Sequence, residues 1–178
     1  MQNQDRTQKM VLSALCTALA YVLPFLTGQI PEIGAMLCPM HLPILLCGFL
    51  CGWRWGLGVG FCAPLLRSLT LGMPPFFPTA LCMALELAVY GAVSGIMHKL
   101  LPRKKPYIYA SLLSAMVAGR LVWGAAMLAC MGATGGSFTS KAFLAGAVTG
   151  ALPGIVLQIL LVPLLVILLE DVKLLKNR

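Results

Sequence analysis

Long apolar runs fill most of this sequence, and most of its charge lies in the short segments between them. Apolar residues make up 60% of the 178 residues, whereas charged residues make up 10%. Soluble domains carry roughly 25% charged residues, so this chain cannot surround itself with an ordinary water-facing surface. A membrane-spanning helix needs about 20 apolar residues, which leaves room for about five to seven spans. The composition therefore predicts a single integral membrane domain over residues 1–178.

Six apolar runs predict an all-α fold with six transmembrane helices. A Pro-rich turn at 72–78 separates the third run from the fourth. The first run continues to Leu26 without a clear cleavage site, so we interpret it as a retained span and not as a signal peptide. The last run is longer than one crossing needs, and Pro153 and Pro163 are expected to break or tilt it. The predicted spans are Lys9–Leu26, His41–Trp53, Gly56–Leu71, Thr79–Leu100, Tyr107–Met131 and Thr139–Leu169.

Basic residues gather on one side of the predicted bundle. An even number of spans puts both termini on the same side, and the other side receives only Lys141, near the start of the sixth span. The positive-inside rule places the basic side, with both termini, in the cytoplasm. The net charge of +8 is then a topology signal, and no basic face interleaved with aromatic residues indicates nucleic acid. The basic side carries Arg6, Lys9, Arg54, Lys99, Arg103, Lys104, Lys105, Lys173, Lys176 and Arg178.

Three charged side chains lie inside the apolar runs, namely Arg67, Glu86 and Arg120. One charge at the centre of a membrane helix costs at least about 2.5–3.5 kcal/mol, so such residues usually face a partner or a cavity. The predicted orientation puts all three in the outer half of the membrane or near its midplane. Arg67 and Glu86 could simply pair with each other, which leaves Arg120 unexplained. Two arginines against one glutamate leave a surplus positive charge, which favours an anionic ligand such as a carboxylate.

Two further residues lie near these charges in the predicted bundle. His41 begins the second span on the outer side, where it is either a ligand contact or an interface residue. Trp123 follows Arg120 by three residues and shares its helix face, where it either packs or stacks on a ligand. The long segment Thr27–Met40 has the length of a lid or binding loop. The predicted substrate-binding residues are His41, Arg67, Glu86, Arg120 and Trp123.

Small residues mark the predicted packing faces. Ala14 and Ala18 lie one turn apart on the first span, a spacing that lets another helix approach closely. Their partner is either another helix of this bundle or a different protein. Gly52, Gly56 and Gly60 predict contact between backbones at the second and third spans.

Cysteine is frequent, and the sequence favours a structural role for it. Most of the seven cysteines fall inside apolar runs, where Cys behaves as a small apolar residue. The chain has no Cys-x-x-Cys pair, so neither a zinc site nor a redox motif is expected.

The combined features resemble the substrate-binding S component of energy-coupling factor (ECF) vitamin transporters. These features are the six spans, Ala14 and Ala18 on the first span, the long loop after it and the basic loop after the fourth span. The segments 37–43 (Leu-Cys-Pro-Met-His-Leu-Pro) and 64–69 (Pro-Leu-Leu-Arg-Ser-Leu) also resemble members of that group.

The resemblance implies a ligand-binding subunit in a bacterial plasma membrane. Such a subunit takes up a vitamin or precursor from outside, under the loop that follows the first span. It docks through the alanines, here Ala14 and Ala18, onto a transmembrane coupling protein that sits on two ATPases. ATP is used by those partners, so no cofactor is expected in this chain. No phosphate loop, HExxH or GxSxG motif indicates an enzyme.

Several alternatives stay open at this point. A pantothenate-like carboxylate is the first candidate substrate, followed by nicotinate-like and folate-like anions, whereas a neutral or cationic solute is disfavoured. A self-contained secondary transporter or channel is the second functional class. The third is an intramembrane enzyme that would use His41 with Ser68, or Glu86 as an acid.

Overall fold

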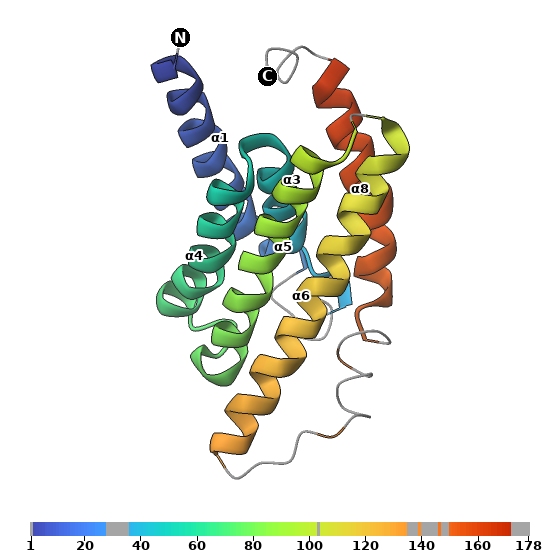
Figure 1. The fold of residues 1–178 in the computed structure, drawn as a ribbon. Helices are drawn as coiled ribbons and strands as arrows, with labels where there is room; N and C mark the ends of the chain where they lie inside the picture. The colour runs from blue at the N-terminus through green and yellow to red at the C-terminus, as the bar shows by residue number, and fades with distance from the viewer. Residues whose placement is uncertain are drawn as a thin grey trace.

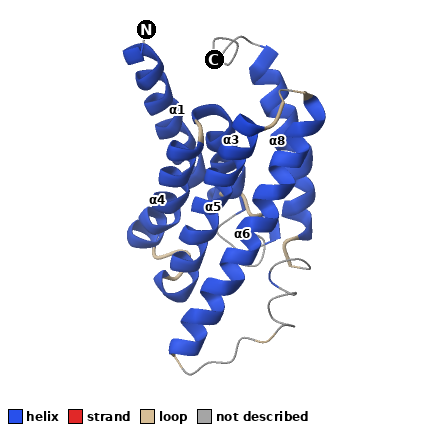
Figure 2. Ribbon diagram, in the orientation of Figure 1, coloured by secondary structure: helices blue, strands red, loops and turns tan. Residues whose placement is uncertain are grey.

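The computed structural model describes residues 2–27, 36–102, 104–134, 139, 146 and 150–171. In these residues the chain forms helices joined by short loops and contains no strand, which confirms the all-α class (Figure 2). The 3₁₀ turn η1 ends the first helix, and the irregular turn η2 precedes α5. The elements are α1 (Gln2–Val22), η1 (Leu23–Thr27), α3 (His41–Cys51), α4 (Trp53–Leu71), η2 (Phe76–Ala80), α5 (Leu81–Leu100), α6 (Lys105–Ala133) and α8 (Leu152–Asp171).

Each of the six predicted spans overlaps one helix of the described residues, namely α1, α3, α4, α5, α6 and α8. Within the described residues, four helical stretches are long and apolar enough to cross a membrane by themselves. They are Arg6–Leu26, Phe76–Leu100, Lys105–Ala133 and Leu152–Leu169. The beginning of α1 and the end of α8 lie at the same end of the bundle (Figure 1). The count of six crossings and the cytoplasmic position of the termini remain predictions.

Helix α3 is short and lies inside the bundle. Its 11 residues correspond to about 16 Å, roughly half the thickness of the hydrocarbon layer. It packs against α1, α4, α5 and α8, and only Leu42 and Leu46 keep partial exposure. The first residue of α3, His41, is therefore buried within the bundle, with 3% of its surface exposed. His41 therefore faces the interior of the bundle and not its outer surface.

Glycine sets the close approach of α4 to α5. A Cβ on Gly56 would lie 2.5 Å from the carbonyl oxygen of Gly91, and one on Gly60 would clash with the backbone at Leu87. The predicted backbone contact is thus confirmed for Gly56 and Gly60. Gly52 differs, because a Cβ there would touch nothing; its φ of 91° turns the chain from α3 into α4. That turn ends the second helix at Cys51, two residues earlier than predicted.

Proline affects the helices less than expected. Pro64 lies inside α4 and Pro163 inside α8, and both helices continue through them. Pro153 is the second residue of α8, in the first turn, where no helical hydrogen bond is lost. Pro163 therefore does not break α8, and the predicted alternative of a tilt there stays a prediction. Most of the predicted beginning of the last span (140–145 and 147–149) and residues 28–35 of the loop after the first span lie outside the described residues.

Candidate functional site

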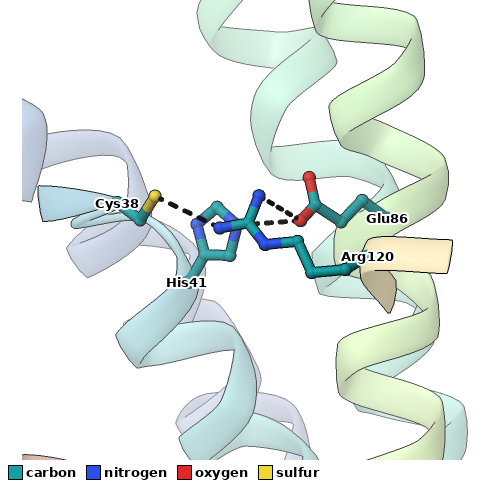
Figure 3. A network of polar contacts seen from close by, with 4 residues as sticks. All are labelled: Cys38, His41, Glu86 and Arg120. Atoms are coloured by element: carbon teal, nitrogen blue, oxygen red, sulfur yellow. Dashed lines mark hydrogen bonds and ion pairs between the residues drawn. The ribbon is translucent and has the colours of Figure 1, made fainter. Parts of the chain in front are cut away.

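Buried polar side chains meet where α3, α5 and α6 converge. Figure 3 shows Glu86 of α5 and Arg120 of α6 pointing toward His41, the first residue of α3, and toward Cys38 just before it. Glu86 is 1% exposed and the Arg120 side chain 14% exposed. We call the set Cys38, His41, Glu86, Tyr90 and Arg120 the polar cluster; Tyr90 is described below.

An ion pair forms the centre of the polar cluster. Arg120 Nη1 lies 3.0 Å from Glu86 Oε1, and His41 Nε2 lies 3.5 Å from the same oxygen (Figure 3). Arg120 Nη2 donates to Cys38 Sγ at 3.7 Å. One guanidinium thus ties α6 both to α5 and to the segment that enters α3. Removing one partner of a buried ion pair commonly costs about 3–5 kcal/mol, because it leaves an uncompensated charge.

The local backbone explains how Cys38 and His41 reach the same place. Cys38 has a φ of 48°, in the left-handed region that residues with a side chain seldom adopt. Its carbonyl accepts a hydrogen bond from the N–H of His41 at 3.0 Å. This tight turn starts α3 inside the bundle. Burial raises the pKa of the Cys38 thiol above its ordinary value, so the group facing Arg120 is a neutral thiol.

Tyr90 completes the polar cluster from α5. It follows Glu86 by one helical turn, and its ring packs edge-on against the His41 imidazole with 5.2 Å between ring centroids. The side chain is fully buried. Sequence analysis missed this residue, although its spacing of four from Glu86 places both on one helix face.

Several polar atoms of the cluster have hydrogen-bonding capacity to spare. Within the described residues, His41 Nδ1, the Tyr90 hydroxyl and Arg120 Nε make no hydrogen bond of ordinary geometry. Native proteins pair the great majority of buried polar groups. The cluster therefore contains buried donors and acceptors that the described part of the chain leaves unused.

Arg67 does not join the polar cluster. Its Nη1 donates to the backbone carbonyl of Tyr21 at 2.6 Å, and its guanidinium lies 5.0 Å from the centre of the Phe25 ring. Tyr21 is in the last turn of α1, where carbonyl groups lack helical partners and carry partial negative charge. That helix end satisfies the arginine. A pair between Arg67 and Glu86 is therefore wrong, since Glu86 pairs with Arg120.

Trp123 lies on α6 three residues beyond Arg120. A Cβ on Gly146 would lie 2.7 Å from the tip of the Trp123 ring, so the indole packs against Gly146, which lies between α6 and α8 in the sequence. The ring is partly exposed. This position agrees with a packing role and places Trp123 beside the polar cluster along α6.

Ala14 and Ala18 lie on the exposed face of α1. Their apolar neighbours on this face include Val11 and Leu15, which are 60% and 54% exposed. The helix packs on the bundle through its other face, for example through Cys16. Packing within the bundle therefore does not explain the two alanines, and the alternative of a separate protein partner remains.

Thiols form contacts of their own elsewhere in the bundle. Cys82 Sγ lies 3.8 Å from Cys130 Sγ, between α5 and α6. In the described part of the chain, no group of three or more His, Cys, Asp and Glu side chains is arranged to hold a metal ion.

Comparison with known families identifies the kind of protein to which this site belongs. The family described as "ECF transporter, substrate-specific component" matches residues 8–166. The chain belongs to this family. No curated protein and no solved structure matches the chain. The resemblance deduced from the spans and the alanines is thereby confirmed.

Membership makes the chain an S component, the substrate-binding subunit of an ECF importer. S components are multi-pass membrane proteins of transport systems and not enzymes. They bind small-molecule substrates and associate with an ECF module, which consists of a membrane coupling protein and ATPases. The polar cluster is the candidate for the substrate site of this subunit.

Proposed function

We propose that this S component captures a small vitamin or vitamin precursor from outside the cell and holds it at the polar cluster. The observation that carries the proposal is the buried pair of Glu86 and Arg120 where α3, α5 and α6 converge. Beside the pair, His41 Nδ1 and Arg120 Nε make no hydrogen bond within the described residues. Buried ionisable residues in membrane helices are uncommon and mark functional sites.

Other predicted residues support the site from outside the polar cluster. Arg67 anchors α4 to the end of α1 and so positions the helices around the site. Trp123 lies on the same helix as Arg120 and borders the connection at Gly146.

The expected charge of the substrate depends on which groups Arg67 and Arg120 contact. A pantothenate-like carboxylate is expected if two arginines face one glutamate. Of these two arginines, Arg120 pairs with Glu86 and Arg67 is bound to the Tyr21 carbonyl. A solute without net charge is therefore the first candidate class of substrate. The binding test compares it with pantothenate-like, nicotinate-like and folate-like anions.

Transport requires a docking face as well as a binding site. We propose that Ala14 and Ala18 on the exposed face of α1 contact the coupling protein, whose two ATPases use ATP, and that this chain needs no cofactor. Small residues at this spacing allow close contact between helices in a membrane.

The test is a binding measurement on the purified full-length chain with a panel of water-soluble vitamins. Arg120→Ala should weaken binding of the solute that the unaltered chain retains by at least tenfold, about 1.4 kcal/mol. Failure to bind any vitamin, with and without the ECF module, would defeat the proposal. Uptake into liposomes that lack ATPase partners would instead establish a self-contained transporter.

A further inference from the structure

Gln158 is a polar residue in the apolar helix α8 that sequence analysis did not single out. The residue is 1% exposed, and among the described residues neither Oε1 nor Nε2 of its amide has a hydrogen-bond partner. It shares one buried stripe of α8 with Gly154, Val162 and Val166. A fully buried amide with neither end paired is unusual, because native proteins pair nearly all such groups.

The position of Gln158 relates it to the polar cluster. Gly154, one turn earlier on the same stripe, packs so closely that a Cβ there would lie 2.7 Å from the carbonyl oxygens of Met36 and Leu37. These two residues directly precede Cys38. Four residues along a helix span about 6 Å, which brings Gln158 to the depth of the first turn of α3. Helix α8 packs against α3 and α6, which both contribute to the cluster.

The polar cluster and Gln158 together carry no net charge when His41 is neutral. Glu86 and Arg120 neutralise each other, and the Cys38 thiol is uncharged because burial raises its pKa. A charged solute would bring an unbalanced charge into a buried site, which is unfavourable unless a partner compensates it. A solute without net charge avoids that penalty.

We propose that the substrate is a small solute without net charge, and that its amide-like or hydroxyl-like groups pair with Gln158 as well as with His41 and Tyr90. This inference rests on the proposed function. An amide offers both a donor and an acceptor, so it matches another amide or a hydroxyl, whereas a carboxylate offers acceptors only. Gln158 is thus a specificity-determining residue of the site.

The first experiment compares neutral and anionic solutes of matched skeleton. The immobilised full-length chain is equilibrated with an equimolar mixture of water-soluble vitamins that includes panthenol with pantothenate and nicotinamide with nicotinate. Bound solutes are released and quantified by mass spectrometry. We expect the retained solute to have no net charge, and any anion of the same skeleton to be retained at least tenfold less.

Two other results of this experiment would contradict the inference. Retention of a charged solute in preference to the neutral ones overturns this inference while supporting the proposed function. Retention of no solute contradicts the proposed function, and the inference falls with it.

The second experiment separates binding from folding with Gln158→Leu. This substitution removes the unpaired amide and keeps a similar volume, so the Tm should stay unchanged or rise. The Kd for the retained solute should increase at least tenfold. Ser111→Ala is the matched control, because Ser111 is also fully buried but its hydroxyl donates to the Tyr107 carbonyl at 2.9 Å; its Kd should change less than twofold. Unchanged affinity in Gln158→Leu, or a joint loss of affinity and Tm, would show that Gln158 does not contact the solute.

Discussion

The buried ion pair allows a quantitative test by paired substitution. At an effective dielectric constant of about 20, opposite unit charges 3.0 Å apart attract each other by about 5–6 kcal/mol, before the cost of removing them from water. Because Glu86 is 1% exposed, Glu86→Leu leaves the Arg120 charge without a partner. We expect this change, or Arg120→Met, to reduce the free energy of unfolding by about 3–5 kcal/mol. The double variant replaces both charges by apolar groups and should lose much less.

Thermal unfolding of the detergent-solubilised chain measures these differences. For a protein of this size, about 1 kcal/mol shifts Tm by about 2–4 °C, so each single variant should unfold roughly 6–20 °C earlier. The double variant should recover most of that loss while still failing to bind the solute. Additive losses, with the double variant as unstable as the sum of the single ones, would show that the two charges do not depend on each other and would refute the reasoning.

Three further perturbations follow from other parts of the bundle. Arg67→Met should lower stability by about 1.5–3 kcal/mol, because it removes a charged hydrogen bond to the end of α1, and should weaken solute binding less than Arg120→Ala. Gly91→Ala should lower Tm, because the new methyl group would overlap the backbone of α4. Ala14→Trp should abolish uptake by the complete transporter while the Kd of the isolated chain stays unchanged.

Each of the three has its own control. Equal losses of affinity in Arg67→Met and Arg120→Ala would place Arg67 at the site after all. Gly58→Ala meets open space, so its Tm should be unchanged or higher; a similar loss in both glycine variants would contradict contact between the backbones. Leu113→Trp, on the exposed face of α6, should leave uptake intact. Loss of uptake in this control would show that the Ala14→Trp effect is not specific to docking.

The residues of the site differ in how visible they are in the sequence. Glu86 and Arg120 are conspicuous because charges are rare in apolar runs, and their common depth follows from counting residues along each span. Tyr90 and Cys38 are inconspicuous, since both residue types are ordinary in membrane helices. Gln158 is a visible signal, because it is a polar residue in the middle of an apolar run.

Arg67 shows where counting along a helix fails. Its depth in the third span is similar to that of Glu86, but depth says nothing about the direction in which a side chain leaves its helix. The end of α1 offers unpaired carbonyl groups, and Arg67 turns toward them. The predicted surplus of positive charge at the site disappears for this reason.

The sequence itself determined the membrane class, the positions of the helices and the presence of charged residues inside the apolar runs. Hydropathy acts locally along a chain, so these features can be found without the tertiary structure. Only the tertiary structure decided which side chains pair with one another. The rotation of each helix about its axis depends on contacts such as those of Gly56 with Gly91, and this rotation directs Glu86 toward Arg120 and Arg67 toward Tyr21. A contact between two helices involves residues far apart in sequence, so no local pattern reveals it.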